Sequence, residues 1–384
     1  MGFIRYCNLP DMAEILTIRF DPSVAVEETS LRWDLGGSRP FARAFPADKL
    51  GRIMPVSIRI SVAALSAACA MSLALPASAQ TTLEISVYHN EQDNFGDTMR
   101  WWIDEIAART EGRIVIEPVY NGALAKVTET LDAVRDGVVP MGIGLASFMS
   151  GAVPALGYAE MIGGLPATAE DASAAFVEIW PDVTAALEPQ GVVPLWGQTA
   201  FGTGVICRDG FLQSAEDWQG QTVRAAGRWQ SKQVEAMGAS PVPIDTGEIY
   251  VALQNGTVNC ALMNPTVTAA LRLYEVAPYY TNLNLPSNIV TYMINRDIWN
   301  DLSEEDRAII EEVSAEATVR AVPYIMEKMD EQIAAIEAGG GQVHVGTQKE
   351  TQAFLDASLP IFEEIGAASG DVGISLEEKL SVYW

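Results

Sequence analysis

The chain has 384 residues, and its 24 basic and 50 acidic side chains give a net charge of −26. Residues 1–79 hold eight basic and seven acidic side chains, so almost all of the negative charge lies in residues 80–384. Such a surface repels nucleic acid and anionic membranes, which excludes both as partners, and it favours a soluble monomer. The sequence has no P-loop, no G-x-S-x-G motif and no His/Cys cluster with zinc spacing, so it predicts no catalytic residue, no metal and no cofactor.

Residues 60–75 form an uncharged apolar run, ISVAALSAACAMSLAL. A short basic segment that begins at Met54 precedes the run, and the small residues Ala77-Ser78-Ala79 follow it, which is typical of a secretory signal peptide. A transmembrane anchor is the alternative, but the run is shorter than the ~20 apolar residues that a bilayer requires. We therefore predict a signal peptide over 54–79, a mature chain that begins at Gln80, and a periplasmic location.

Residues 1–53 show no strand or helix period that we can identify. Because a signal peptide lies at the N-terminus of its protein, we expect Met54 to be the true first residue and residues 1–53 to reflect a start assigned too far upstream. An unusually long basic region ahead of the signal is the alternative. In either case, residues 80–384 carry the fold, and they are enough for one large or two modest domains.

Strand and helix patterns alternate along residues 80–384. Because strands that alternate with helices form βαβ units, this order predicts an α/β fold with largely parallel sheets. The expected strands are 83–88, 113–119, 191–204, 222–225 and 257–263, and the expected helices cover 102–106, 127–134, a segment that begins near Trp229, and 247–254.

A long helix is expected late in the chain. Ser303-Glu304-Glu305-Asp306 has the spacing of a capping box and opens a long helical pattern. Pro323 falls inside the pattern and predicts a kink, because proline removes one backbone hydrogen bond. The helix is expected to end at Gly339-Gly340-Gly341.

Two cysteines, Cys207 and Cys260, remain after signal cleavage. An oxidising compartment permits one disulfide between them. Two small buried thiols are the alternative, and the sequence does not decide between the two states.

The stretch 217–265 reads DWQGQTVRAAGRWQSKQVEAMGASPVPIDTGEIYVALQNGTVNCALMNP. It resembles the DctP-type solute-binding subunit of the tripartite ATP-independent periplasmic (TRAP) transporters, with weaker similarity at Gly122-Ala123-Leu124 and at 302–306. The residues that fit the family pattern are Asp217, Gly220, Val223, Arg224, Gly238, Ala239, Pro241, Pro243, Glu248, Tyr250, Ala252, Leu253, Gln254, Gly256 and Val258.

The resemblance implies a two-lobed α/β periplasmic binding protein of type II-like fold, with the ligand in the cleft between the lobes and a long kinked C-terminal helix. It implies that 80–201 and 289–328 form lobe 1, and that 202–288 and 329–384 form lobe 2. The implied function is capture of a small organic anion, a carboxylate or a related group, for the membrane subunits of a TRAP-type secondary transporter, and not catalysis. A periplasmic sensor that feeds a membrane receptor is the first alternative, and a secreted enzyme is the second.

Arg224 is the strongest site residue. It follows the short strand Thr222-Val223 and precedes small residues, and ligands of open α/β sheets bind at such strand ends. Its planar guanidinium matches a carboxylate with two parallel hydrogen bonds. The resemblance implies that this arginine binds the substrate carboxylate. A structural ion pair, for example with Glu248, is the alternative.

The chain also departs from the family pattern. Many members carry a second arginine in a G-T-R turn, where this chain has Gly202-Thr203-Gly204. Arg208 and Arg228 are candidates to replace that charge, and solvated surface positions are the alternative for both. The family's strand continues as D-G-x-E-N-P, but here Met263 takes the ungapped position and Asn264 reaches the ligand only if the strand bulges.

Further positions align with the family's pocket walls. They are Tyr88, Leu145-Ala146, Asp245 and Thr246, and ordinary packing is the alternative for each. A carboxylate at Asp245 near Arg224 would favour a ligand that carries both signs of charge. Trp229 and Trp196 are candidates for a flat apolar wall or for core packing.

Overall fold

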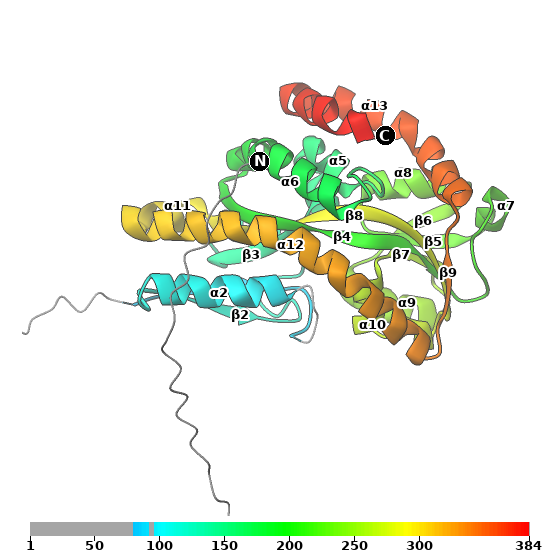
Figure 1. The fold of residues 1–384 in the computed structure, drawn as a ribbon, viewed down its shortest axis with the longest axis horizontal. Helices are drawn as coiled ribbons and strands as arrows, with labels where there is room; N and C mark the ends of the chain where they lie inside the picture. The colour runs from blue at the N-terminus through cyan, green and yellow to red at the C-terminus, as the bar shows by residue number, and fades with distance from the viewer. Residues whose placement is uncertain (1–79, 92–95, 384) are drawn as a thin grey trace, which may run out of the picture. The chain divides into compact units, whose positions relative to one another are not determined.

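The computed structural model describes residues 80–91 and 96–383, so the predicted signal peptide and residues 1–53 lie outside the described residues. The described chain forms one mixed sheet with helices on both faces (Figure 1). The sheet order is β2-β1-β3-β8-β4-β7-β5-β6, and β9 pairs with β8. The strands are β1 (Thr81–Ser86), β2 (Ile114–Val119), β3 (Met141–Leu145), β4 (Val192–Cys207), β5 (Thr222–Ala225), β6 (Ser240–Pro243), β7 (Cys260–Met263), β8 (Tyr279–Asn295) and β9 (Gln342–Val345).

Two long antiparallel strands, β4 and β8, join the two ends of the sheet (Figure 1). On one side, β1 pairs in parallel with β2 and β3, and on the other, β5 pairs in parallel with β6 and β7. The prediction of largely parallel sheets is therefore confirmed for the strands at the two ends of the sheet. It is wrong for the centre of the sheet, where β8 pairs antiparallel with both β3 and β4. The register of β4 against β8 shifts between Thr199 and Val205, which marks the point where the long strands pass from one side to the other.

The helices cover both faces of the sheet, and their order confirms the α/β class. The expected helix over 247–254 forms as the 3-10 turn Thr246–Glu248 followed by α9. The helices are α2 (Asp97–Arg109), α3 (Thr130–Arg135), α4 (Ala146–Met149), α5 (Gly157–Glu160), α6 (Ala169–Leu187), α7 (Ala215–Trp218), α8 (Arg228–Ala236), α9 (Ile249–Gln254), α10 (Pro265–Ala270), α11 (Arg296–Asp301), α12 (Glu304–Ala338) and α13 (Gln348–Leu380).

The long helix α12 begins where the sequence predicts. Ser303 is its N-cap, and the Ser303 hydroxyl accepts a hydrogen bond from the backbone N–H of Asp306 at 3.1 Å. Pro323 lies inside the helix, and Figure 1 shows that the helix axis changes direction along its length. Because α12 contacts α2 and α6 near one end of the sheet and α10 and β9 near the other, it runs along both sides of the molecule.

The second long helix, α13, packs across α5, α6 and α8 (Figure 1). Its early residue Phe354 belongs to the core around β5 and β7, whereas Ile365 and Leu376 belong to the core around β1 and β3. The helix therefore ties the two cores together, and the boundaries of the two lobes stay a prediction. None of the helices in residues 80–91 and 96–383 combines the length and apolar character of a membrane span.

Cys207 and Cys260 form a disulfide. They are directly opposite each other in the antiparallel pair of β4 and β7, and their Cα atoms are 4.1 Å apart. Both side chains are buried, so the bridge fixes the junction between the long strand and the parallel strands β7 and β5.

Candidate ligand-binding site

A small cavity of about 40 Å³ lies where the parallel strands of both sides end. We call it the inner pocket. One wall follows β1 and β3, and the facing wall follows β5 and β7, while β4 and β8 form the floor. Its lining residues are Tyr88, Leu145, Ser147, Phe148, Ala200, Arg224, Ala226, Thr246, Met263, Asn264, Val267, Asn288 and Val290. Strands β1 and β3 end near the middle of the long pair β4 and β8, and β5 and β7 end there from the opposite direction, which is why residues so distant in sequence meet here.

Arg224 is the one charged side chain among these lining residues, and it is 3% exposed. Its Nε donates to the carbonyl oxygen of Ile244 at 2.9 Å, and its Nη1 donates to that of Leu262 at 3.3 Å. Burial lowers the pKa of Arg224 to about 10, and the carboxylate of Asp245 acts in the opposite direction. A guanidinium carries five N–H donors, so two carbonyl contacts leave donors for a ligand.

The alternative ion pair between Arg224 and Glu248 is not formed. Glu248 Oε1 lies 3.6 Å from Nζ of Lys126, and both side chains are mostly exposed. Lys126 follows β2 and Glu248 precedes α9, so this pair joins the two sides of the molecule.

Met263 and Asn264 both line the inner pocket, although β7 has no bulge against β4. Met263 ends the strand opposite Gly204, and Asn264 is the N-cap of α10. The Asn264 Oδ1 accepts a hydrogen bond from the N–H of Val267 at 2.9 Å. The oxygen is thus engaged in capping, and the amide nitrogen is the part of Asn264 that can donate to a ligand.

Three polar or aromatic lining residues were not predicted from the sequence: Ser147, Phe148 and Asn288. Ser147 is 4% exposed, and its Oγ has no hydrogen-bond partner among the described atoms. Asn288 Oδ1 accepts a hydrogen bond from the backbone N–H of Ser147 at 3.1 Å. Ser147 follows closely on the buried strand that ends at Leu145, and this position is a sequence signal for a site residue, whereas nothing local marks Asn288.

A wider pocket of about 310 Å³ continues from the inner pocket, and we call it the outer pocket. The two share Tyr88, Thr246 and Val267, and the outer pocket adds residues such as His89 and Asn121. These shared residues place the outer pocket next to the inner pocket that Arg224 lines.

Asp245 lines neither the inner nor the outer pocket, but one chain neighbour contacts Arg224 and the other lines both pockets. Ile244 holds the guanidinium of Arg224 through its carbonyl, and Thr246 lines both pockets. One Asp245 oxygen, Oδ1, accepts from the N–H of Gly247 at 2.9 Å. The other, Oδ2, is shielded from solvent and has no hydrogen-bond partner in the part of the chain that is described.

The two tryptophans lie away from the inner pocket. Trp229 is buried behind it, with its backbone N–H bonded to Glu160 and the guanidinium of Arg228 stacked 4.2 Å above its ring. Trp196 is buried in the core and stacks on Tyr292 with ring centroids 3.7 Å apart.

Among the described residues that line the inner and outer pockets, no second arginine takes the place of the family's. Gly204 lies so close to β8 that a Cβ there would be 2.0 Å from the carbonyl oxygen of Thr281, so a side chain does not fit at this position. Arg208 lies beside Gly256, and Arg228 is exposed over Trp229. Neither residue lines the inner or the outer pocket.

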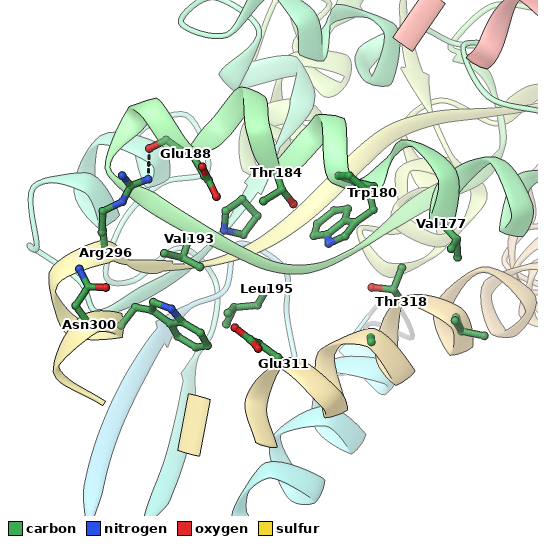
Figure 2. Close-up of a pocket in the computed structure, with 15 residues that line it drawn as sticks. Val177, Trp180, Thr184, Glu188, Val193, Leu195, Arg296, Asn300, Glu311 and Thr318 are labelled. Atoms are coloured by element: carbon green, nitrogen blue, oxygen red, sulfur yellow. Dashed lines mark hydrogen bonds between the residues drawn. The ribbon is translucent and has the colours of Figure 1, made fainter. Parts of the chain in front are cut away.

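A larger pocket of about 690 Å³ lies between α6, β4, α11 and α12 (Figure 2). Its walls include Trp180, Leu195 and Thr318, and Arg296 at one end donates to the carbonyl oxygen of Glu188. It shares no lining residue with the inner pocket. The guanidinium of Arg296 donates to main-chain carbonyl oxygens, and the other charged lining residues, Glu188 and Glu311, are acidic. Despite its smaller volume, the pocket at Arg224 is therefore the candidate site for an anion.

Comparison with known proteins shows which proteins the chain resembles in sequence and in fold. The chain is 25% identical over 181 residues to the ectoine-binding periplasmic protein TeaA of Halomonas elongata, which is 46% of this chain and 53% of TeaA. The chain thus spans about half the length of that relative. It is 26% identical over 277 residues to the C4-dicarboxylate-binding periplasmic protein DctP of Rhodobacter capsulatus, which is 70% of this chain and 81% of DctP.

The structure is similar to that of DctP7, a Bordetella pertussis extracytoplasmic solute receptor binding pyroglutamic acid. The TM-score is 0.70, at 21% identity, over 78% of this chain and 99% of DctP7, so the two-lobed fold is shared. The family model of the bacterial extracellular solute-binding proteins, family 7 (DctP), matches residues 85–369. Because this match covers most of the chain, the protein belongs to the family 7 bacterial extracellular solute-binding proteins.

Proposed function

We propose that this protein captures a small organic acid in the periplasm and delivers it to the membrane subunits of a TRAP-type transporter. The observation that carries the proposal is the buried guanidinium of Arg224, which faces a cavity between the two sides of the molecule. Burying a cation is costly, and burial lowers the pKa of this arginine although the charge of Asp245 opposes the shift. A ligand carboxylate would supply a negative charge and two aligned acceptors.

Closure of the two sides around the ligand is the proposed mechanism. Residues from both sides line the inner pocket, so a ligand bound to all of them stabilises the closed form over an open one. The membrane subunits would then recognise the closed form. The lobe boundaries at 201/202, 288/289 and 328/329 belong to this proposal.

The relatives support an organic acid as the ligand class. Their printed ligands are ectoine, C4-dicarboxylates and pyroglutamic acid, and all of these carry a carboxyl group. The same family assignment favours a binding protein over an enzyme. A monomer is proposed from the strong negative charge, which opposes self-association.

A thermal-shift screen of carboxylates, sulfonates and zwitterions, followed by calorimetry on the compounds that bind, tests the proposal. Binding of a carboxylate without turnover, lost in Arg224→Ala, is the expected result. Catalytic conversion of a bound compound would replace the proposal with an enzyme. Loss of ligand uptake after deletion of the gene separates a transport role from the alternative of a periplasmic sensor.

Export has its own test. Intact-mass analysis of protein purified from the periplasm should show a chain that begins at Gln80. A species that keeps the apolar run 60–75 would contradict the predicted cleavage.

A further inference from the structure

The charges around the inner pocket are almost balanced. Arg224 is the one charged lining residue, and Asp245 is the carboxylate that acts on it. Arg208 and Arg228 lie elsewhere, so they do not supply a second positive charge to a bound ligand. Because Arg224 and Asp245 already balance each other, one ligand carboxylate on Arg224 leaves a net negative charge, and a second carboxylate would find no further cation among the described lining residues.

Two buried polar atoms near Arg224 have no partner in the described chain. Asp245 Oδ2 is a charged acceptor that is shielded from solvent, and Ser147 Oγ lies in the opposite wall of the inner pocket. A buried carboxylate oxygen, which accepts, or a buried hydroxyl, which can accept or donate, is destabilising without a hydrogen bond, so such groups normally have a partner. A donor on the ligand would satisfy them, and a positively charged donor would also pair with the charge of Asp245.

A second carboxylate would have the opposite effect. It would bring a like charge near Asp245 in a poorly solvated place, where like charges repel strongly. The other polar lining residues, among them Thr246 and Asn264, are neutral, so they offer hydrogen bonds but no positive charge to compensate a second carboxylate.

We infer that the ligand is a compact zwitterion, with its carboxylate on Arg224 and a protonated N–H group directed to Asp245 and Ser147, and that the site rejects dicarboxylates. This inference rests on the proposed function of the inner pocket. It narrows that function, because an organic acid without a positive group should bind only weakly.

A matched set of cyclic acids tests the inference by calorimetry. Proline carries the carboxylate and a protonated ring nitrogen, cyclopentanecarboxylate lacks the nitrogen, and cis-cyclopentane-1,2-dicarboxylate adds a second carboxylate. The four- and six-membered ring counterparts of all three compounds vary the size. In at least one ring size, we expect the zwitterion to bind about tenfold or more tightly than the carbocyclic acid, and the diacid to bind most weakly.

Asp245→Asn is the matched variant, because asparagine keeps the Oδ1 that caps Gly247 and removes only the charge. It should reduce the preference for the zwitterion over the carbocyclic acid by about tenfold, while Ser147→Ala should weaken both compounds more evenly. If Asp245→Asn does not fold, as judged by its thermal transition, the ligand series on the unaltered protein still decides the question.

Three outcomes distinguish failure of the zwitterion inference from failure of the proposed function. A diacid or carbocyclic acid that binds as tightly as the zwitterion in every ring size overturns the inference and leaves the proposed function intact. An unchanged preference in a folded Asp245→Asn protein also overturns it. If no carboxylate of any kind binds, the proposed function of the pocket fails as well.

Discussion

Glu160 in α5 caps α8 through the backbone N–H of Trp229, which lies 69 residues later in the chain. The Oε1 of Glu160 accepts from Trp229 at 2.8 Å and from Gln230 at 2.9 Å. The helix needs this remote cap because its own N-cap residue, Gly227, has no side chain. A Cβ at Gly227 would lie 2.2 Å from the carbonyl oxygen of Ser147. The close approach of Gly227 to the Ser147 carbonyl therefore places the pocket wall that contains Ser147 next to the wall that contains Ala226.

We expect Glu160→Gln to change how stability depends on pH. Burial raises the pKa of Glu160 to about 7, while hydrogen bonds from Ser150, Gln230 and Trp229 and the charge of Arg228 oppose that shift. A carboxyl group whose pKa is raised by folding favours the folded state at low pH, and this contribution is lost as pH rises from about 4.5 through about 7. Glutamine cannot ionise, so the variant should gain stability relative to the unaltered protein by roughly 2–3 kcal/mol between pH 5 and pH 8.

Urea unfolding of both proteins at pH 5, 6, 7 and 8 measures this difference. Glu84→Gln, at an exposed position on β1, is the control and should show no such trend. Parallel pH profiles for the Glu160→Gln and unaltered proteins would mean that Glu160 does not titrate in this range.

Arg224→Ala should lower ligand affinity by about 2–5 kcal/mol, since it removes one partner of a buried charge pair. Arg224→Lys should also bind more weakly, because lysine keeps the charge but loses the fork that matches a carboxylate. Calorimetry with the strongest carboxylate ligand is the measurement. Arg208→Ala, outside both pockets, is the control and should bind normally. A folded Arg224→Ala variant with unchanged affinity would make Arg224 a structural residue.

Replacing both cysteines, Cys207→Ala with Cys260→Ala, should lower the free energy of unfolding by about 2–4 kcal/mol, because the bridge closes a long loop in the unfolded chain. The sequence separation of the two cysteines is 53 residues. Denaturant unfolding with and without a reductant gives the value, and the double variant should no longer respond to the reductant. Detection of two free thiols in periplasmic protein would show that the bridge is not formed there.

The pair between Lys126 and Glu248 should matter little, although it joins the two sides of the molecule. The nitrogen and oxygen are 3.6 Å apart and both side chains are more than half exposed, so water and salt screen their attraction. Lys126→Glu should weaken ligand binding less than about threefold at low ionic strength, with no effect at high salt. Restoration of affinity in Lys126→Glu with Glu248→Lys would identify the pair as the cause, whereas a large effect that persists in salt would place Lys126 in direct contact with the ligand.

The sequence by itself determined the features that depend on near neighbours. The alternation of strands and helices, the cap of α12 at Ser303 and the strand of Arg224 all follow from periodicity or from residues a few positions apart. The helix α13 was not predicted, although Thr347 and Glu350 form a capping box at its start. This capping box is a local sequence signal, so the start of α13 could have been predicted from the sequence.

Only the tertiary structure decided which of the candidate side chains meet. Tyr88, Thr246, Met263 and Asn264 gather around Arg224 because the strands of the two sides end at the middle of β4 and β8 from opposite directions, while Trp229 is buried elsewhere in the core. Ser147, Asn288 and Glu160 were not predicted, because each acts on a partner 69 or more residues away. Neither periodicity nor capping depends on such partners, and their contacts exist only once the long strands β4 and β8 have paired.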